Sequence, residues 1–96
     1  MELAQLEIFR AIAEEGSVTA AAEKLHRVPS NISTRLKQLE KELGCELFRR
    51  EKLRLYITDN GRTFLAYSQR ILALSEEAKQ SVSGQRPDGI FTLGAI

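Results

Sequence analysis

Two helical stretches separated by only three residues constrain this chain more than any other feature of its sequence. The first covers Val18–Leu25 and contains the run "TAAAEKL", and the second extends from Pro29 to about Leu43 after the break "HRV". Ser17 is a favourable N-cap for the first helix. Pro29 suits the first turn of the second, because its missing N–H is not needed there. Two helices joined by so short a turn are typical of a helix-turn-helix unit.

Four further elements are predicted around this unit. Apolar residues at helical spacing predict a helix over Leu3–Glu15. The segments "CELFRRE" and "LRLYIT" predict two short strands with a tip near Glu51–Leu53. Thr58 is expected to cap a long helix over Asp59–Val82. The predicted fold class is mainly α: a winged helix-turn-helix of three helices and a short β-hairpin wing, followed by a long dimerisation or linker helix.

The chain is expected to divide into three parts. Residues 1–58 would form the winged helix-turn-helix, and residues 59–84 the linker helix. Turn-forming residues then predict a hinge, and the terminal "GIFTLGAI" has the composition of a buried strand with nothing in this chain to pair with it. Residues 85–96 are therefore interpreted as a hinge and the first strand of a further domain.

The charges are unevenly distributed, although the net charge is only +1. From Lys24 to Arg54 there are nine basic and four acidic residues, so this segment carries +5 and the remainder −4. Such segregation predicts one face that meets a polyanion; a solvated charged surface is the alternative. A single cysteine, no apolar stretch of bilayer length and no signal-like start favour the reducing cytoplasm and no membrane partner.

The helix over residues 29–43 has an unusual composition at its start. A helical wheel places Ile32, Leu36, Leu39 and Leu43 on the buried face. The remaining sides carry Ser30, Asn31, Ser33, Thr34, Arg35, Lys37, Gln38 and Lys41. Short polar side chains let a helix approach the DNA major groove, where Asn or Gln can pair with adenine and Arg with guanine. The alternative is competition to cap the helix, which explains one of the four short polar residues well and the others poorly.

Two other segments suggest interaction surfaces. The basic run "FRREKLR" predicts a wing that binds phosphate or enters the minor groove. Arg50 could equally be a structural residue bonded to Glu46 or to a helix end. The long helix carries apolar residues around about half its circumference, which predicts burial against both its own domain and a partner helix. Packing wholly within a monomer is the alternative, but a helix of about 36 Å would outrun so small a core.

The sequence resembles the N-terminal domain of LysR-type transcriptional regulators. The resemblance rests on "LEIFRAIAEEGSVTAAAEKLH", "SNISTRLKQLEKELGCELFRR" and "ITDNGRTFL", and covers roughly residues 3–65. It implies a bacterial regulator that binds promoter or operator DNA as a dimer on an interrupted palindrome. It also implies a homodimer through the linker helix, or a tetramer in the full-length protein. A small-molecule effector would bind only through a domain that follows the hinge.

The chain departs from the family at one position that matters for base reading. Members often have Gln where Pro29 stands, and proline has no side-chain donor or acceptor. Readout would then pass to neighbouring residues or become an apolar contact with a thymine methyl. The expected base-contacting residues are Pro29, Ser30, Asn31, Thr34 and Arg35. The expected backbone and wing contacts are Ser17, Arg27, Ser33, Lys37, Gln38, Arg50, Lys52 and Arg54. The expected dimer contacts are Tyr67, Ile71, Leu74, Ala78 and Val82.

Other residue types give little reason to expect catalysis. Cys45 follows a helix stop and is interpreted as core filler, and His26 alone makes no metal site. No catalytic set or glycine-rich phosphate loop stands out, so no cofactor, metal or enzymatic activity is expected. The competing function class is a protein-interaction module that uses a winged-helix fold and a dimerising helix without binding DNA.

Overall fold

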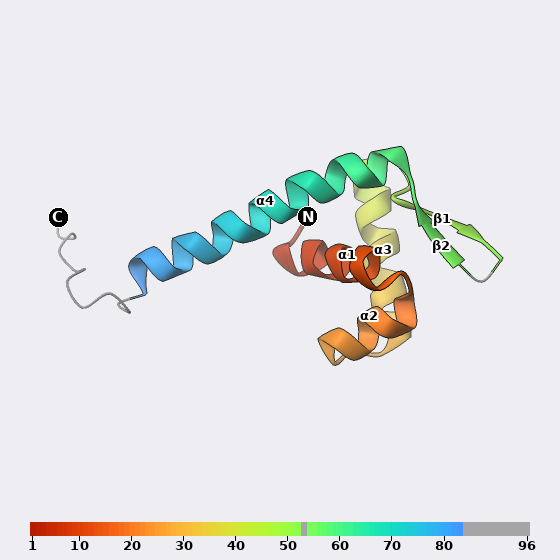
Figure 1. Ribbon diagram of the computed structural model, residues 1–96, viewed down its shortest axis with the longest axis horizontal. Coiled ribbons are helices and arrows are strands. Elements are labelled where there is room, and N and C mark those ends of the chain that lie inside the picture. Colours follow the sequence, from red (N-terminus) through yellow and green to blue (C-terminus); the bar gives the residue numbers. More distant parts are fainter. Residues whose placement is uncertain (53, 84–96) are drawn as a thin grey trace.

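The computed structural model describes residues 1–52 and 54–83. Its elements are α1 (Leu3–Glu15), α2 (Val18–Leu25), α3 (Pro29–Leu43), β1 (Phe48–Glu51), β2 (Arg54–Ile57) and α4 (Asp59–Val82) (Figure 1). The helix bounds agree with the predicted ones, whereas the strands are shorter than the predicted segments, and β1 begins at Phe48 and not at Cys45. The mainly α fold with a two-stranded wing is confirmed. The hinge and strand expected over residues 85–96 lie outside the described residues.

Local capping explains where the helices begin and end. The hydroxyl of Ser17 caps α2 by accepting a backbone N–H at 3.0 Å, and that of Thr58 caps α4 in the same way at 2.9 Å. Helices α1 and α3 each end at a left-handed glycine, Gly16 and Gly44. Helix α2 ends instead at His26, whose φ of 59° places a non-glycine residue in the left-handed region. This conformation turns the chain sharply toward α3.

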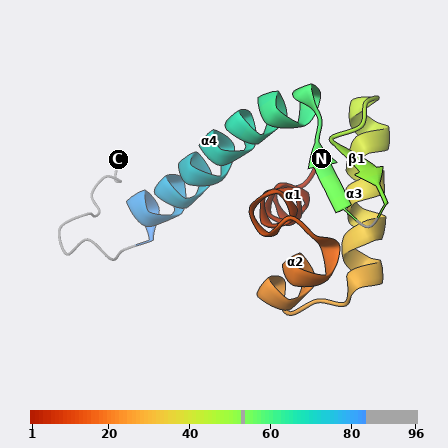
Figure 2. The same ribbon diagram turned by 45° about the vertical axis from the view of Figure 1, so that its right-hand side comes forward.

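Helix α1 is the centre of the hydrophobic core. It packs against α2, α3 and α4, and Figure 2 shows it between α4 and α3. Phe9 contacts two other aromatic rings, Phe48 from the wing and Phe64 from α4, each at a centroid distance of 5.4 Å. Ala21 and Ala22 are buried, so the small residues of α2 allow close helix packing. The core therefore joins all parts of the helix-turn-helix to the wing.

The wing is an antiparallel pair of strands held at its base by α3. Phe48 pairs with Ile57, and the pairing runs out to Glu51 opposite Arg54. One carboxylate oxygen of Glu40 accepts the backbone N–H groups of Leu47 and Phe48, at 2.8 and 3.3 Å. Two donors before and at the start of β1 are thus satisfied by a side chain of α3, which fixes the wing relative to that helix.

The start of α4 lies very close to the same wing base. A Cβ atom added to Gly61 would clash with the carbonyl oxygen of Leu47, so only glycine fits there without backbone movement. The hydroxyl of Thr58 also donates to the carbonyl of Glu46 at 2.7 Å. From this anchor α4 extends past the other helices (Figure 1). Among the described residues, no helix contains a stretch long and apolar enough to cross a bilayer.

Candidate nucleic-acid interface

The exposed side of α3 is the surface on which most of the predicted DNA contacts gather. Ile32 and Leu39 are fully buried beneath it, as the helical wheel predicted. Five expected contacts on α3 have exposed side chains: Pro29, Ser30, Thr34, Lys37 and Gln38. Their short or flexible side chains leave the helix backbone accessible to a groove-shaped partner. The remaining expected contacts on α3, Asn31, Ser33 and Arg35, are half-buried and lie on its two edges, with Lys37 next to Ser33.

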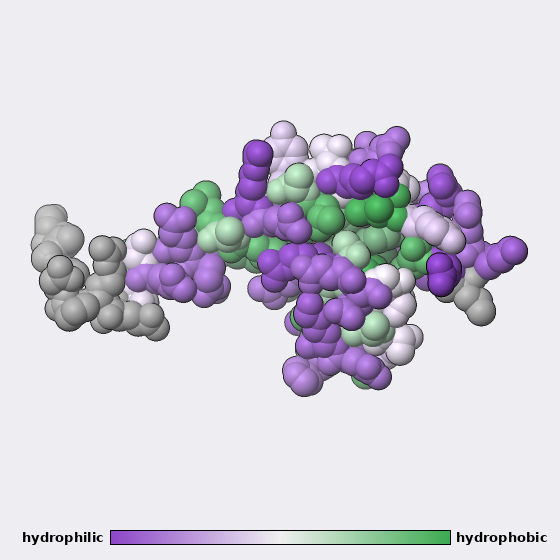
Figure 3. All heavy atoms as spheres, viewed as in Figure 1, coloured by the Kyte–Doolittle hydropathy of each residue, from purple (hydrophilic) through white to green (hydrophobic). Residues whose placement is uncertain are grey.

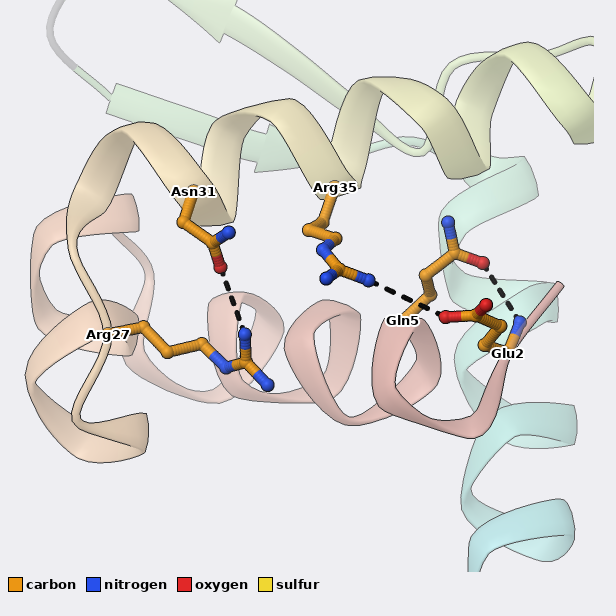
Figure 4. A network of polar contacts seen from close by, with 5 residues as sticks. All are labelled: Glu2, Gln5, Arg27, Asn31 and Arg35. Atoms are coloured by element: carbon orange, nitrogen blue, oxygen red, sulfur yellow. Dashed lines mark hydrogen bonds and ion pairs between the residues drawn. The ribbon is translucent and has the colours of Figure 1, made fainter.

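The α1-side edge of α3 consists of Asn31 and Arg35, one turn apart. Arg27 Nη1, from the turn before α3, donates a hydrogen bond to Asn31 Oδ1 at 3.1 Å (Figure 4). Arg35 Nη1 lies 3.5 Å from the Oε1 atom of Glu2, the residue that precedes α1. Both predicted base readers on this edge are therefore engaged by charged side chains from other segments.

Glu2 is itself held in place at the start of α1. Its backbone N–H donates to the side-chain Oε1 atom of Gln5 at 2.9 Å (Figure 4), and Gln5 is buried. The Glu2 carboxylate is mostly exposed, whereas the Arg35 side chain is about one-third exposed. Such a pair adds little stability because water screens it, but it limits the positions that the guanidinium occupies.

The wing-side edge of α3 consists of Ser33 and Lys37, which line a shallow groove together with Arg50 of β1. A second hollow beside it is lined by Ser17 at the start of α2 and by Lys52 at the wing tip. Within the described residues, none of these five side chains except the capping Ser17 makes a hydrogen bond or an ion pair. Cationic side chains that have no ion pair and lie beside a helix N-terminus are well placed to bind a phosphate group.

The structure separates the wing cations that the sequence grouped together. Because cross-strand partners share a face, Arg50 lies on the inner face with Leu55, toward α3. Arg54 lies on the outer face with Arg49, whose Nε atom donates to Glu51 at 3.2 Å. The alternative of an Arg50–Glu46 bond receives no support from the part of the chain that the structure describes. Lys52 is at the tip with a φ of 56°, a left-handed residue that the sequence did not reveal.

Two acidic residues that position this surface were missed by the sequence analysis. Glu40 holds the wing base, and Glu2 faces Arg35. The one available signal for Glu40 was an acid in the middle of a basic segment. Glu2 gave no signal, because its partner lies 33 residues away in the sequence and meets it only through the packing of α1 against α3.

A second exposed surface runs along α4. Ser68 and Leu72 are buried against the domain, whereas Tyr67, Leu74 and Val82 are 56%, 65% and 84% exposed. Figure 3 shows hydrophobic residues on the surface of α4 where the helix extends past α1. Of the other expected dimer contacts, Ala78 is exposed and Ile71 is half-buried. Four of the five side chains that the sequence assigned to a partner are thus exposed, and Ile71 is half-buried.

Two ionisable side chains away from this surface form a pair between α1 and α2. The hydrogen bond from Lys24 lowers the pKa of Glu14, and the same bond raises the pKa of Lys24. This pair joins α1 to α2 at 2.7 Å. Among the residues with described positions, no group of His, Cys, Asp and Glu side chains could hold a metal ion. Cys45 is half-buried and packs against the core, as expected.

Comparison with known proteins identifies the fold. Residues 3–62 match the model of a family described as bacterial regulatory helix-turn-helix proteins of the lysR family. The chain belongs to the LysR family. This LysR-family chain is 43% identical over 97 residues to the transcriptional regulator CzcR of Bacillus thuringiensis subsp. konkukian (strain 97-27). It is 37% identical over 97 residues to YofA of Bacillus subtilis (strain 168). Both alignments cover 100% of this chain and 34% of the relative, so the chain spans about a third of their length.

Solved structures agree with this assignment. The crystal structure of the CbnR_DBD–DNA complex has a TM-score of 0.81 and 36% identity, covering 90% of this chain and 100% of that one. The BenM_DBD/catB site 1 DNA complex has a TM-score of 0.83 and 32% identity, covering 88% and 90%. The family description and the names of these relatives refer to regulators of transcription.

Proposed function

We propose that this chain is the DNA-binding domain of a LysR-type transcriptional regulator, with α3 in the major groove and the wing at the backbone or minor groove. The carrying observation is the exposed side of α3, which lies between an edge of engaged polar side chains and an edge of unengaged cations. The first edge suits base reading and the second suits phosphate binding. Two related structures contain DNA-binding domains with DNA, which supports the same use of this surface.

The other candidate, a protein-interaction module, fits the surface less well. Protein interfaces have an apolar, charge-depleted centre, whereas the exposed side of α3 offers hydroxyls, amides and cations. The only large exposed apolar residue at its start is Val28, 62% exposed.

A regulator that binds promoter DNA in bacteria acts in the cytoplasm, and we place the chain there. An effector would bind a domain beyond these residues.

The decisive experiment compares selected and random duplex DNA. A site is first enriched from a random pool with the unmodified chain, and affinities are then measured across a salt series. Arg35→Ala should cost about 1–3 kcal/mol on the selected site and little on random DNA. Arg50→Ala or Lys52→Ala should weaken binding to both DNAs. Each should also reduce the slope of log affinity against log salt concentration by about one per lost phosphate contact. Binding that ignores sequence, with no change of slope, would favour the protein-interaction module.

We also propose that α4 forms a symmetric dimer through Tyr67, Ile71, Leu74, Ala78 and Val82. Three of these are large apolar residues more than half exposed, which supports burial against a second copy. A two-fold dimer presents two α3 helices to half-sites about 34–36 Å apart, so the selected site should be an interrupted palindrome. Ile71→Glu should give monomers with unchanged helix content and weak binding to the full site. Sedimentation of the unmodified chain as a monomer at high micromolar concentration would contradict this assembly.

A further inference from the structure

The hydrogen bond between Arg27 and Asn31 has a consequence for base recognition. It joins two segments whose backbones are already fixed. The backbone N–H of Arg27 donates to the carbonyl of Ala22 at 2.8 Å, closing the turn after α2. The backbone N–H of Asn31 donates to the carbonyl of Val28 at 3.0 Å, in the first turn of α3. The side-chain bond of 3.1 Å therefore spans two rigid anchors.

This bond decides which way the amide of Asn31 faces. A guanidinium group only donates hydrogen bonds, so its partner on Asn31 must be the oxygen and not the amide nitrogen. With Oδ1 held toward Arg27, the Nδ2 atom lies on the other side of the amide, away from the guanidinium (Figure 4). A free asparagine would sample both orientations. Here the two N–H donors of Asn31 face away from Arg27, and its oxygen faces the guanidinium group.

The orientation changes what Asn31 can distinguish. Reading adenine bidentately requires the amide oxygen to accept from N6–H while the nitrogen donates to N7. When the oxygen is held by Arg27, only the donation remains, and N7 is present in both purines. We propose that Arg27 is a positioning residue that turns Asn31 into a reader of purine N7, tolerant of both adenine and guanine. The inference rests on the proposed function and names how one residue of that site selects its base.

The first test removes the acceptor from the DNA. Each purine of the selected site is replaced singly by its 7-deaza analogue, which lacks only the N7 acceptor, and affinities are measured for the unmodified chain. One position should show a loss of about three- to tenfold, the value of one hydrogen bond. Asn31→Ala should be insensitive to that replacement. Asn31→Asp is the matched control, because it keeps the oxygen that faces Arg27 but has no donor, and it should be equally insensitive.

The second test releases the amide. The unmodified chain should bind duplexes that carry adenine or guanine at this position with affinities within about twofold of each other. Arg27→Ala should prefer adenine by about three- to tenfold, because the freed amide can make the second bond. Arg27→Lys keeps a donor and should restore part of the purine tolerance. If Arg27 only contacted a phosphate, its loss would weaken binding to the adenine and guanine duplexes equally. The ratio of the two affinities would then not change.

Three results would overturn the inference. They are an adenine preference already present in the unmodified chain, an unchanged base ratio in Arg27→Ala, and the absence of any 7-deaza position that depends on Asn31. Each leaves the proposed function intact as long as selected DNA is bound better than random DNA. Failure of the proposed function is a separate outcome, in which the unmodified chain does not distinguish the two pools at all.

Discussion

The two edges of α3 are held in different ways. On the α1-side edge, Asn31 is bonded to Arg27 and Arg35 faces Glu2, so both side chains start from a restricted position. On the wing-side edge, neither Ser33 nor Lys37 has a side-chain partner within the described residues. Base edges demand defined geometry, and an ordered reader loses less conformational entropy on binding. Phosphate groups tolerate mobile cations, because a flexible ammonium group can follow the charge.

The wing-side edge is ordered through its backbone and not through its functional side chains. Glu40 holds the N–H groups at the wing base, and Gly61 lets α4 approach that base closely. Arg50 and Lys52 project from this fixed support without partners of their own in the described part of the chain. The comparison therefore predicts that the two edges respond differently when their supports are removed.

The largest expected effect comes from removing the support of the wing. Glu40→Ala leaves the two backbone N–H groups of Leu47 and Phe48 without their acceptor, which should lower the free energy of unfolding by about 2 kcal/mol. The salt slope of DNA binding should fall as the wing loosens, while base discrimination by α3 is kept. Urea unfolding and affinity measurements check both points. Glu46→Ala is the matched control, because Glu46 is an exposed acid in the same groove whose side chain holds no backbone group. An equal loss of unfolding free energy in this variant would contradict the role of Glu40 in supporting the wing.

The sequence revealed local devices well and long-range ones poorly. Ser17 and Thr58 act within a few residues, so their chemistry alone placed the starts of two helices. The burial of Ile32 followed from helical periodicity in the same way. In contrast, the Arg35–Glu2 pair depends on the angle at which α1 crosses α3, which no local pattern encodes.

The candidate site shows the same division. Its residues could be named from their types and from their spacing on one helix. Their hydrogen bonds and ion pairs with other segments could not be predicted in this way. The separation of Arg50 from Arg54 onto opposite faces required the strand register, because a shift of one residue would exchange them. The left-handed conformation of His26 was also hidden, since histidine has only a modest preference for that region.

A smaller effect is expected on the α1-side edge. Glu2→Gln removes the charge that faces Arg35, and an exposed pair of this kind contributes about 0.5–1 kcal/mol. The change also removes a negative charge near DNA, which should raise the affinity for all sequences. We therefore expect the ratio of selected to random binding to fall while random binding rises. Glu7→Gln changes an exposed acid on α1 that has no ion pair in the described part of the chain, and the ratio should not move; equal ratios in both variants would show that Glu2 acts only through its charge.

The smallest effect concerns a charged pair away from α3, between Glu14 of α1 and Lys24 of α2. The hydrogen bond from Lys24 lowers the pKa of Glu14 from 4.5, so this contribution to stability is present above 4.5 and is lost as pH falls through the lowered pKa. The pKa of Lys24 is raised from 10.5 by the same bond, so its contribution is present below 10.5 and is lost as pH rises through the raised pKa.

Lys24→Gln should therefore destabilise the chain slightly at neutral pH, and the difference from the unmodified chain should disappear in acid as Glu14 is protonated. Urea unfolding at a series of pH values in low salt measures this, and high salt should reduce it because both side chains are exposed. A difference of equal size at pH 3 and pH 7 would contradict the pairing. Base discrimination should not change, because neither side chain is bonded to α3. We therefore expect an ion pair to act on DNA selectivity only where, as with Glu2 and Arg35, one partner lies on the edge proposed to read the bases.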